Sequence, residues 1–184
     1  MARGLNAHGI AVAIPGYDLC PQVRVGDIIE EMRTACRRLA DRGPIVVAGH
    51  SAGAHLAACL LATDWGPQGL VPAAYALSGL FDLEPLRATY VNEALGMSEA
   101  EARRLSPLFW PPPAGRVLDA VVGEVESGEY HRQSRAIVER WGAAGVRTRF
   151  EAVPGANHFT VVAPLADPDS PMTLRIADLA RESR

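Results

Sequence analysis

The sequence contains no lysine: its 18 basic residues are all arginine, set against 21 acidic residues in a chain of 184. Chemistry that needs a lysine amine, such as a pyridoxal Schiff base or a phosphate-binding P-loop, is therefore excluded. Cysteine is almost as scarce. Cys20, Cys36 and Cys59 are odd in number and widely spaced, which suits neither a disulfide framework nor a zinc site. We interpret them as small buried thiols.

Long apolar runs are also missing. No stretch approaches the roughly 20 apolar residues needed to cross a bilayer, and the N-terminus lacks the charged-then-apolar pattern of a secretion signal. The formal charge of -3 comes from scattered acids and arginines, so we expect no nucleic-acid partner and no membrane partner. These absences predict a cytoplasmic protein. The length and the 48% hydrophobic content predict a single domain over residues 1–184.

Two patterns alternate along the chain. Short apolar runs rich in β-branched residues alternate with Ala/Leu/Arg-rich stretches of helical period, which predicts the α/β class: a mostly parallel sheet with helices on both faces. The expected strands are 9–14, 44–49, 73–78, 117–123 and 148–153. The expected helices are 27–42, 54–63, 134–144 and 171–182. The proline-rich end of residues 80–113 indicates an excursion over the sheet edge, with short helical pieces.

A G-x-S-x-G pentapeptide, Gly49-His50-Ser51-Ala52-Gly53, stands between an expected strand and an expected helix. This turn is so tight that the serine takes a strained backbone, so we expect Gly49 and Gly53 to relieve clashes while Ser51 projects from the strand end. The helix dipole and the backbone N–H of Ala52 then face a developing oxyanion. A chance match in a Gly- and Ala-rich chain is the alternative, which the flanking strand and helix disfavour. The pattern predicts that Ser51 is a nucleophile.

A general base and an acid are expected on loops after later strands, in the chain order acid then histidine. The loop at 154–159 presents His158, which we assign as the base; an unused surface histidine is the alternative. After the expected strand 117–123, Glu124, Glu126 and Glu129 compete for the acid that orients the imidazole. We prefer Glu126, three residues past the strand end, and interpret the other two as solvated loop carboxylates or helix N-terminal charges.

Two further groups of residues have open interpretations. Phe109 and Trp110 are candidates for a rigid aromatic wall of a substrate pocket, and an apolar cluster that seals the sheet edge is an equal alternative. Tyr17, at the end of the first expected strand, is a weaker pocket candidate. His50 and His55 are five residues apart and so not stacked on one helical face as metal ligands would be, which favours structural roles.

Several segments together resemble one known family. GHSAGAHLAA at 49–58, SGLFDLEPL at 78–86, VVGEVESGEYHRQS at 121–134 and PGANHFTVV at 154–162 look like the kynurenine formamidase-like (arylformamidase-like) hydrolases of the α/β-hydrolase superfamily. The resemblance implies an α/β-hydrolase fold with Glu126 as acid and His158 as base. It also implies hydrolysis of a small-molecule formamide or ester through an acyl-enzyme on Ser51, without metal or organic cofactor.

The N-terminus departs from that family. Its members carry an H-G-G-x-W type segment whose N–H groups complete the oxyanion hole, whereas residues 1–9 here look like the end of the helix that follows it. We therefore expect a shortened chain that lacks the first strands, leaves a gap at the sheet centre and exposes edges that favour a homodimer. The functional alternatives are an arylformamidase, a carboxylesterase of broad small-acyl specificity and a truncated, non-catalytic relative.

Overall fold

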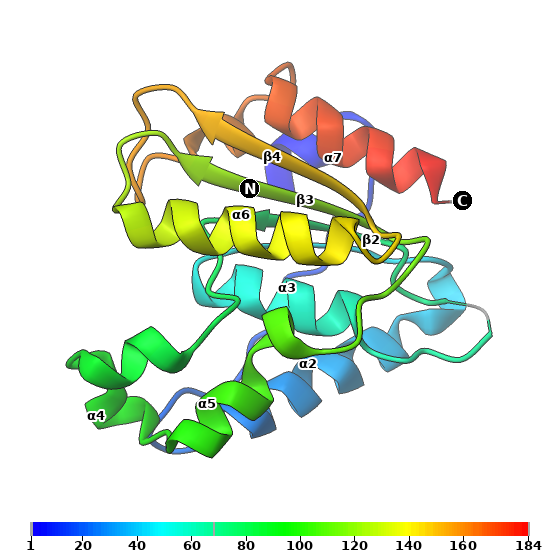
Figure 1. The fold of residues 1–184 in the computed structure, drawn as a ribbon. Helices are drawn as coiled ribbons and strands as arrows, with labels where there is room; N and C mark the ends of the chain where they lie inside the picture. The colour runs from blue at the N-terminus through cyan, green and yellow to red at the C-terminus, as the bar shows by residue number, and fades with distance from the viewer. Residues whose placement is uncertain (1, 68, 184) are drawn as a thin grey trace.

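The computed structural model describes residues 2–67 and 69–183, and this part of the chain is built around a four-stranded parallel sheet. The strands are β1 (Val46–His50), β2 (Ala73–Leu77), β3 (Val117–Gly123) and β4 (Arg147–Val153), and they lie in the order β1-β2-β3-β4. Because every neighbouring pair is parallel, the carboxyl ends of all four strands meet at one edge of the sheet, where the arrowheads point in Figure 1. Residues that follow different strands are thereby brought together.

Helices cover both faces of this sheet, as the alternating pattern predicts. They are α1 (Ala2–Ala7), α2 (Val25–Arg38), α3 (Ala52–Leu61), α4 (Val91–Leu95), α5 (Glu99–Leu105), α6 (Gly128–Gly142) and α7 (Pro171–Glu182). Short 3-10 turns are η1 (Ala40–Arg42), η2 (Glu84–Ala88), η3 (Pro107–Phe109) and η4 (Ala163–Ala166). Helices α3 and α6 pack on one face, with α2 beneath α3, while α1 and α7 lie on the other (Figure 1).

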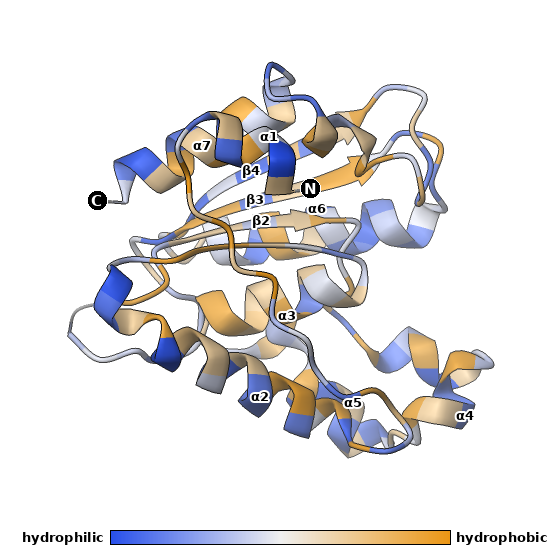
Figure 2. Ribbon diagram, turned by 180° about the vertical axis from the view of Figure 1, so that it is seen from behind, coloured by the Kyte–Doolittle hydropathy of each residue, from blue (hydrophilic) through white to orange (hydrophobic). Residues whose placement is uncertain are grey.

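Burial follows composition in each layer. β2 and β3 are buried along their whole length, which suits the small and β-branched side chains of strands covered on both faces. α3 is buried almost all round, since it lies between the sheet and α2. α2 is amphipathic: Ile28, Ile29, Met32 and Cys36 face the core while its opposite face is hydrophilic (Figure 2). Cys59 is also buried and Cys20 is half-buried, and all three thiols are free.

Residues 9–14 are not a strand, and this prediction is wrong. The segment leads from α1 towards α2 as an irregular, largely exposed chain (Figure 2), and Ile14 is 75% exposed. An apolar, β-branched run forms a strand only beside a neighbour that takes up its backbone hydrogen bonds. In the part of the chain that the structure describes, β1 pairs with β2 and not with this segment.

The excursion at residues 80–113 also differs from its predicted place. It contains the expected short helices, but it lies against helices α2 and α3 (Figure 1) rather than over the sheet edge. Leu105, the last residue of α5, accepts a hydrogen bond from the buried His55 of α3, with 2.8 Å between ring nitrogen and carbonyl oxygen. Arg24, which precedes α2, donates to the carbonyl of Gly96 at 2.9 Å. No helix within residues 2–67 and 69–183 is long and apolar enough to cross a membrane.

Candidate active site

Ser51 forms the turn between β1 and α3 with a backbone that L-residues rarely adopt, at φ 55° and ψ -116°. Such a conformation costs on the order of 1–3 kcal/mol and persists only where its surroundings hold it. The Ser51 N–H donates to the carbonyl of Leu77 in β2 at 2.9 Å, and its own carbonyl accepts from Ala54 and His55 in the first turn of α3. The strained backbone expected for this serine is therefore present and anchored on both sides.

The two glycines of the pentapeptide have different roles. A Cβ on Gly49 would lie 2.1 Å from the carbonyl oxygen of Gly53, so position 49 admits only glycine while the turn stays closed. A Cβ on Gly53 would meet nothing within 4 Å. The expectation that both glycines relieve clashes is thus correct for Gly49 and wrong for Gly53. The atoms that approach Gly49 belong to the backbone of Gly53, whereas the space around a Cβ at position 53 is open.

Ala52 is the first residue of α3, and its side chain is exposed at the carboxyl edge of the sheet. N–H groups in the first turn of an α-helix have no acceptor within the helix, and the aligned peptide dipoles give this end a partial positive charge. Ala52 directly follows Ser51, so its N–H is one of these first-turn groups.

The Glu126 carboxylate is the centre of a hydrogen-bonded group, and its side chain is 0% exposed. Its Oε2 lies 2.8 Å from Nδ1 of His158, and since a carboxylate only accepts, the ring N–H donates. Its Oε1 accepts from the N–H of Gly123 at 2.7 Å and from the hydroxyl of Ser78 at 2.5 Å. These three donors compensate the burial of a charged group that would otherwise be strongly unfavourable.

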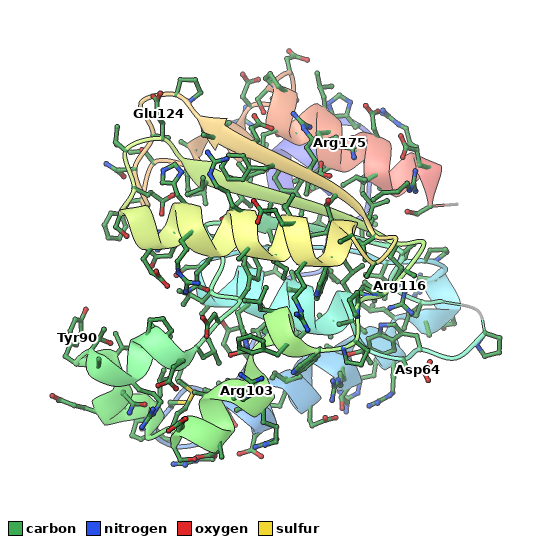
Figure 3. All side chains as sticks on the ribbon, viewed as in Figure 1. Asp64, Tyr90, Arg103, Arg116, Glu124 and Arg175 are labelled. Carbon is green, nitrogen blue, oxygen red and sulfur yellow. The ribbon has the colours of Figure 1, made fainter. Side chains whose placement is uncertain are left out.

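The two competing glutamates are engaged elsewhere. Glu124, labelled near the strand ends in Figure 3, accepts the N–H of Gly155 at 2.8 Å and so ties its loop to the histidine loop. Glu129 accepts from the guanidinium of Arg132 at 2.7 Å, and this hydrogen bond lowers the pKa of the Glu129 carboxyl. Neither has a hydrogen bond to His158 in the described residues.

Within residues 2–67 and 69–183, no group of three or more His, Cys, Asp or Glu side chains is placed to hold a metal ion.

Three rings surround the His158 imidazole, whose side chain is 23% exposed. The His50 ring is tilted against it at 4.5 Å between centroids, Tyr130 is stacked on it at 4.5 Å, and Phe159 meets it edge-on at 5.7 Å. Burial, and then the nearby His158, lower the pKa of His50. Burial raises the pKa of the Tyr130 hydroxyl, and the Ser51 side chain partly opposes this shift. The rings of His50 and Tyr130 thus both pack on the His158 imidazole.

Sequence reasoning missed three of these neighbours: Ser78, Tyr130 and the ring of His50. Ser78 stands directly at the carboxyl end of β2, and Tyr130 lies in the first turn of the helix after the acid loop. Both positions are readable as polar residues at strand ends or helix starts on the carboxyl edge, which is where parallel α/β sheets gather functional groups. Their contacts with Glu126 and His158 depend on the assembled sheet.

The aromatic pocket candidates lie in other surroundings. The Arg33 guanidinium of α2 stands 5.7 Å from the ring centroid of Trp110, and that of Arg103 in α5 stands 4.6 Å from the ring centroid of Phe109. Tyr17 is exposed on the irregular segment between α1 and α2. The structure does not bring these three together with the rings around the imidazole. Phe109 and Trp110 are partly buried and pack against the core cluster to which α2, α3 and α5 contribute.

Comparisons with known proteins agree with this architecture, although no profile of a known protein family matches the chain. A kynurenine formamidase of Salmo salar is 33% identical over 186 residues, covering 94% of this chain and 63% of the relative. A crystal structure of a candidate thioesterase from a Silicibacter species superposes with a TM-score of 0.80 at 36% identity, covering 95% of this chain and 67% of that one. An esterase of the bacterial hormone-sensitive lipase family gives a TM-score of 0.70 at 25% identity, with 91% and 64% covered. The chain thus spans less than two thirds of the length of the curated formamidases that it matches.

Proposed function

We propose that this chain, which belongs to the kynurenine formamidase-like branch of the α/β-hydrolase superfamily, is a serine hydrolase that reacts through Ser51. The observation that carries the proposal is the 2.8 Å contact between Glu126 and His158, which come from two different loops. The strained backbone of Ser51, at the carboxyl end of β1, supports it. A buried carboxylate that holds one nitrogen of an imidazole leaves the other nitrogen free to act as a base. Among the ion pairs of the described residues, this is the one that joins a histidine ring to a carboxylate.

In the proposed reaction His158 takes the proton of the Ser51 hydroxyl as Oγ attacks the carbonyl carbon of the substrate. The Ala52 N–H stabilises the oxyanion, and the Glu126 carboxylate keeps the imidazole oriented and stabilises its cation. His158 then gives the proton to the leaving amine or alcohol, which leaves an acyl group on Ser51. Water, activated by the same imidazole, hydrolyses that ester and restores the enzyme.

The oxyanion site of this proposal has one assigned backbone donor. The sequence holds no H-G-G-x-W segment to supply further N–H groups. Removing one donor from such a site lowers turnover by on the order of 10²–10³-fold. We therefore expect formation of a covalent adduct at Ser51 to be a more sensitive readout than steady-state turnover.

The substrate class proposed first is an aryl formamide, because the curated relatives are kynurenine formamidases. The second is a small carboxylic ester, because a similar solved structure is an esterase. The side of the site that carries Phe159, whose side chain is 83% exposed and edge-on to the imidazole, offers an aromatic surface to either substrate. Relative kcat/KM for a formyl-arylamine and for an aryl acetate separates the two.

The test is labelling of the purified chain with a fluorophosphonate probe, followed by peptide mass spectrometry. We expect the adduct on Ser51, none in Ser51→Ala and at least a hundredfold slower labelling in His158→Ala. His131→Ala is the matched control: this half-buried histidine, whose ring Nε2 lies 3.2 Å from the Glu124 carbonyl oxygen, has no assigned role in the reaction, so labelling should stay at the level of the unmodified chain. A folded sample that does not label, or labels on another residue, would contradict the proposal.

A further inference from the structure

Ser78 occupies the point of the sheet where the nucleophile turn and the acid loop meet. It follows the last residue of β2, and its backbone N–H donates to the carbonyl of Val121 in β3 at 2.7 Å. The preceding residue, Leu77, accepts the N–H of Ser51 at 2.9 Å. The carboxyl end of β2 is therefore hydrogen-bonded to the proposed nucleophile on one side and to the strand that leads into the acid loop on the other.

The backbone of Ser78 is unusual for a residue with a side chain. Its φ is 51°, in the left-handed region that favours glycine, and the residue is 0% exposed. A glycine would adopt this conformation without strain. The next residue is itself a glycine, and a Cβ at Gly79 would lie 2.2 Å from the ring of Phe81, so this bend is closely packed. Because glycine would be less strained here, a serine at this position suggests that its hydroxyl has a role.

That hydroxyl has a single acceptor in the described part of the chain, the Glu126 carboxylate. The Oγ–H donates to Oε1 at 2.5 Å, a short hydrogen bond to a fully buried charged group. The Gly123 N–H holds the same oxygen at 2.7 Å, and the other carboxylate oxygen faces Nδ1 of His158. With both donors present, rotation of the carboxylate away from the imidazole would break two hydrogen bonds at once.

We propose that Ser78 is a positioning residue: it fixes the Glu126 carboxylate and, through it, the tautomer and direction of the His158 imidazole. The proposal rests on the serine-hydrolase function above and adds a fourth member to its machinery. Ser78 bonds Oε1 of the carboxylate, whereas the imidazole faces Oε2, so Ser78 acts through Glu126 and not on the substrate. Its loss should lower the rate of the chemical step and leave substrate binding unchanged.

Two substitutions separate this role from a merely structural one. Ser78→Ala removes the hydroxyl and keeps a side chain in the strained conformation, whereas Ser78→Gly removes the hydroxyl and relieves the strain. Ser106→Ala is the matched control, because Ser106 is also fully buried and its hydroxyl is also satisfied, by the N–H of Leu83 and the carbonyl of Ala102. The control loses a buried hydroxyl without touching the acid.

The measurements are the maximal rate of fluorophosphonate labelling, the probe concentration at half-maximal rate, and thermal unfolding. Loss of a hydrogen bond to a charged group corresponds to a rate decrease of about 10- to 100-fold. We expect that decrease in both Ser78 variants with an unchanged half-saturating concentration, while Ser78→Gly unfolds at a higher temperature than Ser78→Ala. Ser106→Ala should unfold at a lower temperature than the unmodified chain and label at its rate.

Labelling rates that follow thermal stability, or a Ser78→Gly variant that labels as fast as the unmodified chain, would overturn the proposal.

A readout that does not depend on activity is the downfield proton resonance of the His158 Nδ1–H, identified by its absence in His158→Ala. We expect both Ser78 variants to shift or broaden it and Ser106→Ala to leave it in place. If the unmodified chain does not label, the hydrolase function fails, yet an unchanged resonance would still refute the role of Ser78 and a shifted one would still support it.

Discussion

The carboxyl edge of the sheet and the helix layer beneath it each contain a histidine with a hydrogen-bonded ring, and the two histidines differ in their partners. His158, at the sheet edge, is partly exposed and faces a carboxylate. His55, in α3, is 4% exposed, and its ring nitrogen lies 2.8 Å from the carbonyl of Leu105, with the Cys59 sulfur at 3.6 Å. A neutral carbonyl accepts the N–H of a neutral ring, whereas a carboxylate also stabilises the cation. The residue type is shared, and under the proposed function the hydrogen-bond partner distinguishes the structural histidine from the catalytic one.

Backbone strain divides the two regions in the same way. The non-glycine residues with positive φ in the described part of the chain are Ser51 and Ser78, and both stand at the carboxyl edge. The helix layer instead uses regular caps, such as the Ser98 hydroxyl that accepts the N–H of Glu101 at the start of α5. Strained backbone conformations are concentrated at functional sites, whereas relaxed ones are typical of segments that contribute only to stability.

The largest effect is expected for Glu126→Gln, which tests whether the carboxyl edge depends on this charge. An amide has nearly the same shape but cannot stabilise the imidazole cation and can present an N–H to Nδ1, so the labelling rate should fall by on the order of 10⁴-fold. Glu124→Gln and Glu129→Gln are the matched controls and should stay within about threefold, because neither carboxylate is bonded to the imidazole. A rate loss shared equally by all three variants would remove the distinction between the glutamates.

The next largest effect is expected at the two glycines of the turn. Gly49→Ala places a methyl group against the carbonyl of Gly53 and should lower the free energy of unfolding by about 1–3 kcal/mol. It should also remove most of the fluorophosphonate labelling at Ser51. Gly53→Ala meets open space and should change stability by no more than about 0.5 kcal/mol. Denaturant unfolding and labelling of both variants measure this difference. Equal losses at the two positions would show that the close approach is not the reason for glycine at 49.

The turn at Ser51 is predictable from sequence because its determinants are local: a strand, five residues and a helix. The proximity of Glu126 and His158 is predictable from their order in the chain and from their positions in loops that follow parallel strands. The bond from Ser78 is not, since it requires β2 to pair beside β3 with the acid loop folded back over both. The same limit explains the failure at residues 9–14, where the side-chain pattern of a strand exists without a neighbour to complete it.

A smaller effect is expected from the buried histidine of the helix layer. Burial lowers the pKa of His55 below its usual 6.5, so between that lowered pKa and about 6.5 the unfolded chain binds a proton that the folded chain does not. The free energy of unfolding should therefore fall as the pH drops below about 6.5, by up to about 1.4 kcal/mol per pH unit for this group. His55→Gln removes this contribution and leaves that of His50, whose pKa is also lowered. Urea unfolding across this pH range measures both slopes, and identical slopes would contradict the assignment.

The smallest effect is expected for Trp110→Phe, which asks whether the aromatic cluster of the helix layer serves the site. The substitution removes the indole N–H bond to the Arg104 carbonyl, 2.7 Å long, and weakens the contact with the Arg33 guanidinium. Both are partly exposed, so the loss should be about 1 kcal/mol of unfolding free energy. Since the ring packs between α2 and α5, labelling and the relative kcat/KM for a formyl-arylamine and an aryl acetate should stay within about twofold.

Phe159→Leu is the contrasting variant, because it replaces a ring that borders the imidazole, and it should change the preference between these substrates. If Trp110→Phe changes that preference instead, the aromatic wall predicted from the sequence reaches the substrate, and the helix layer and the carboxyl edge act as one site.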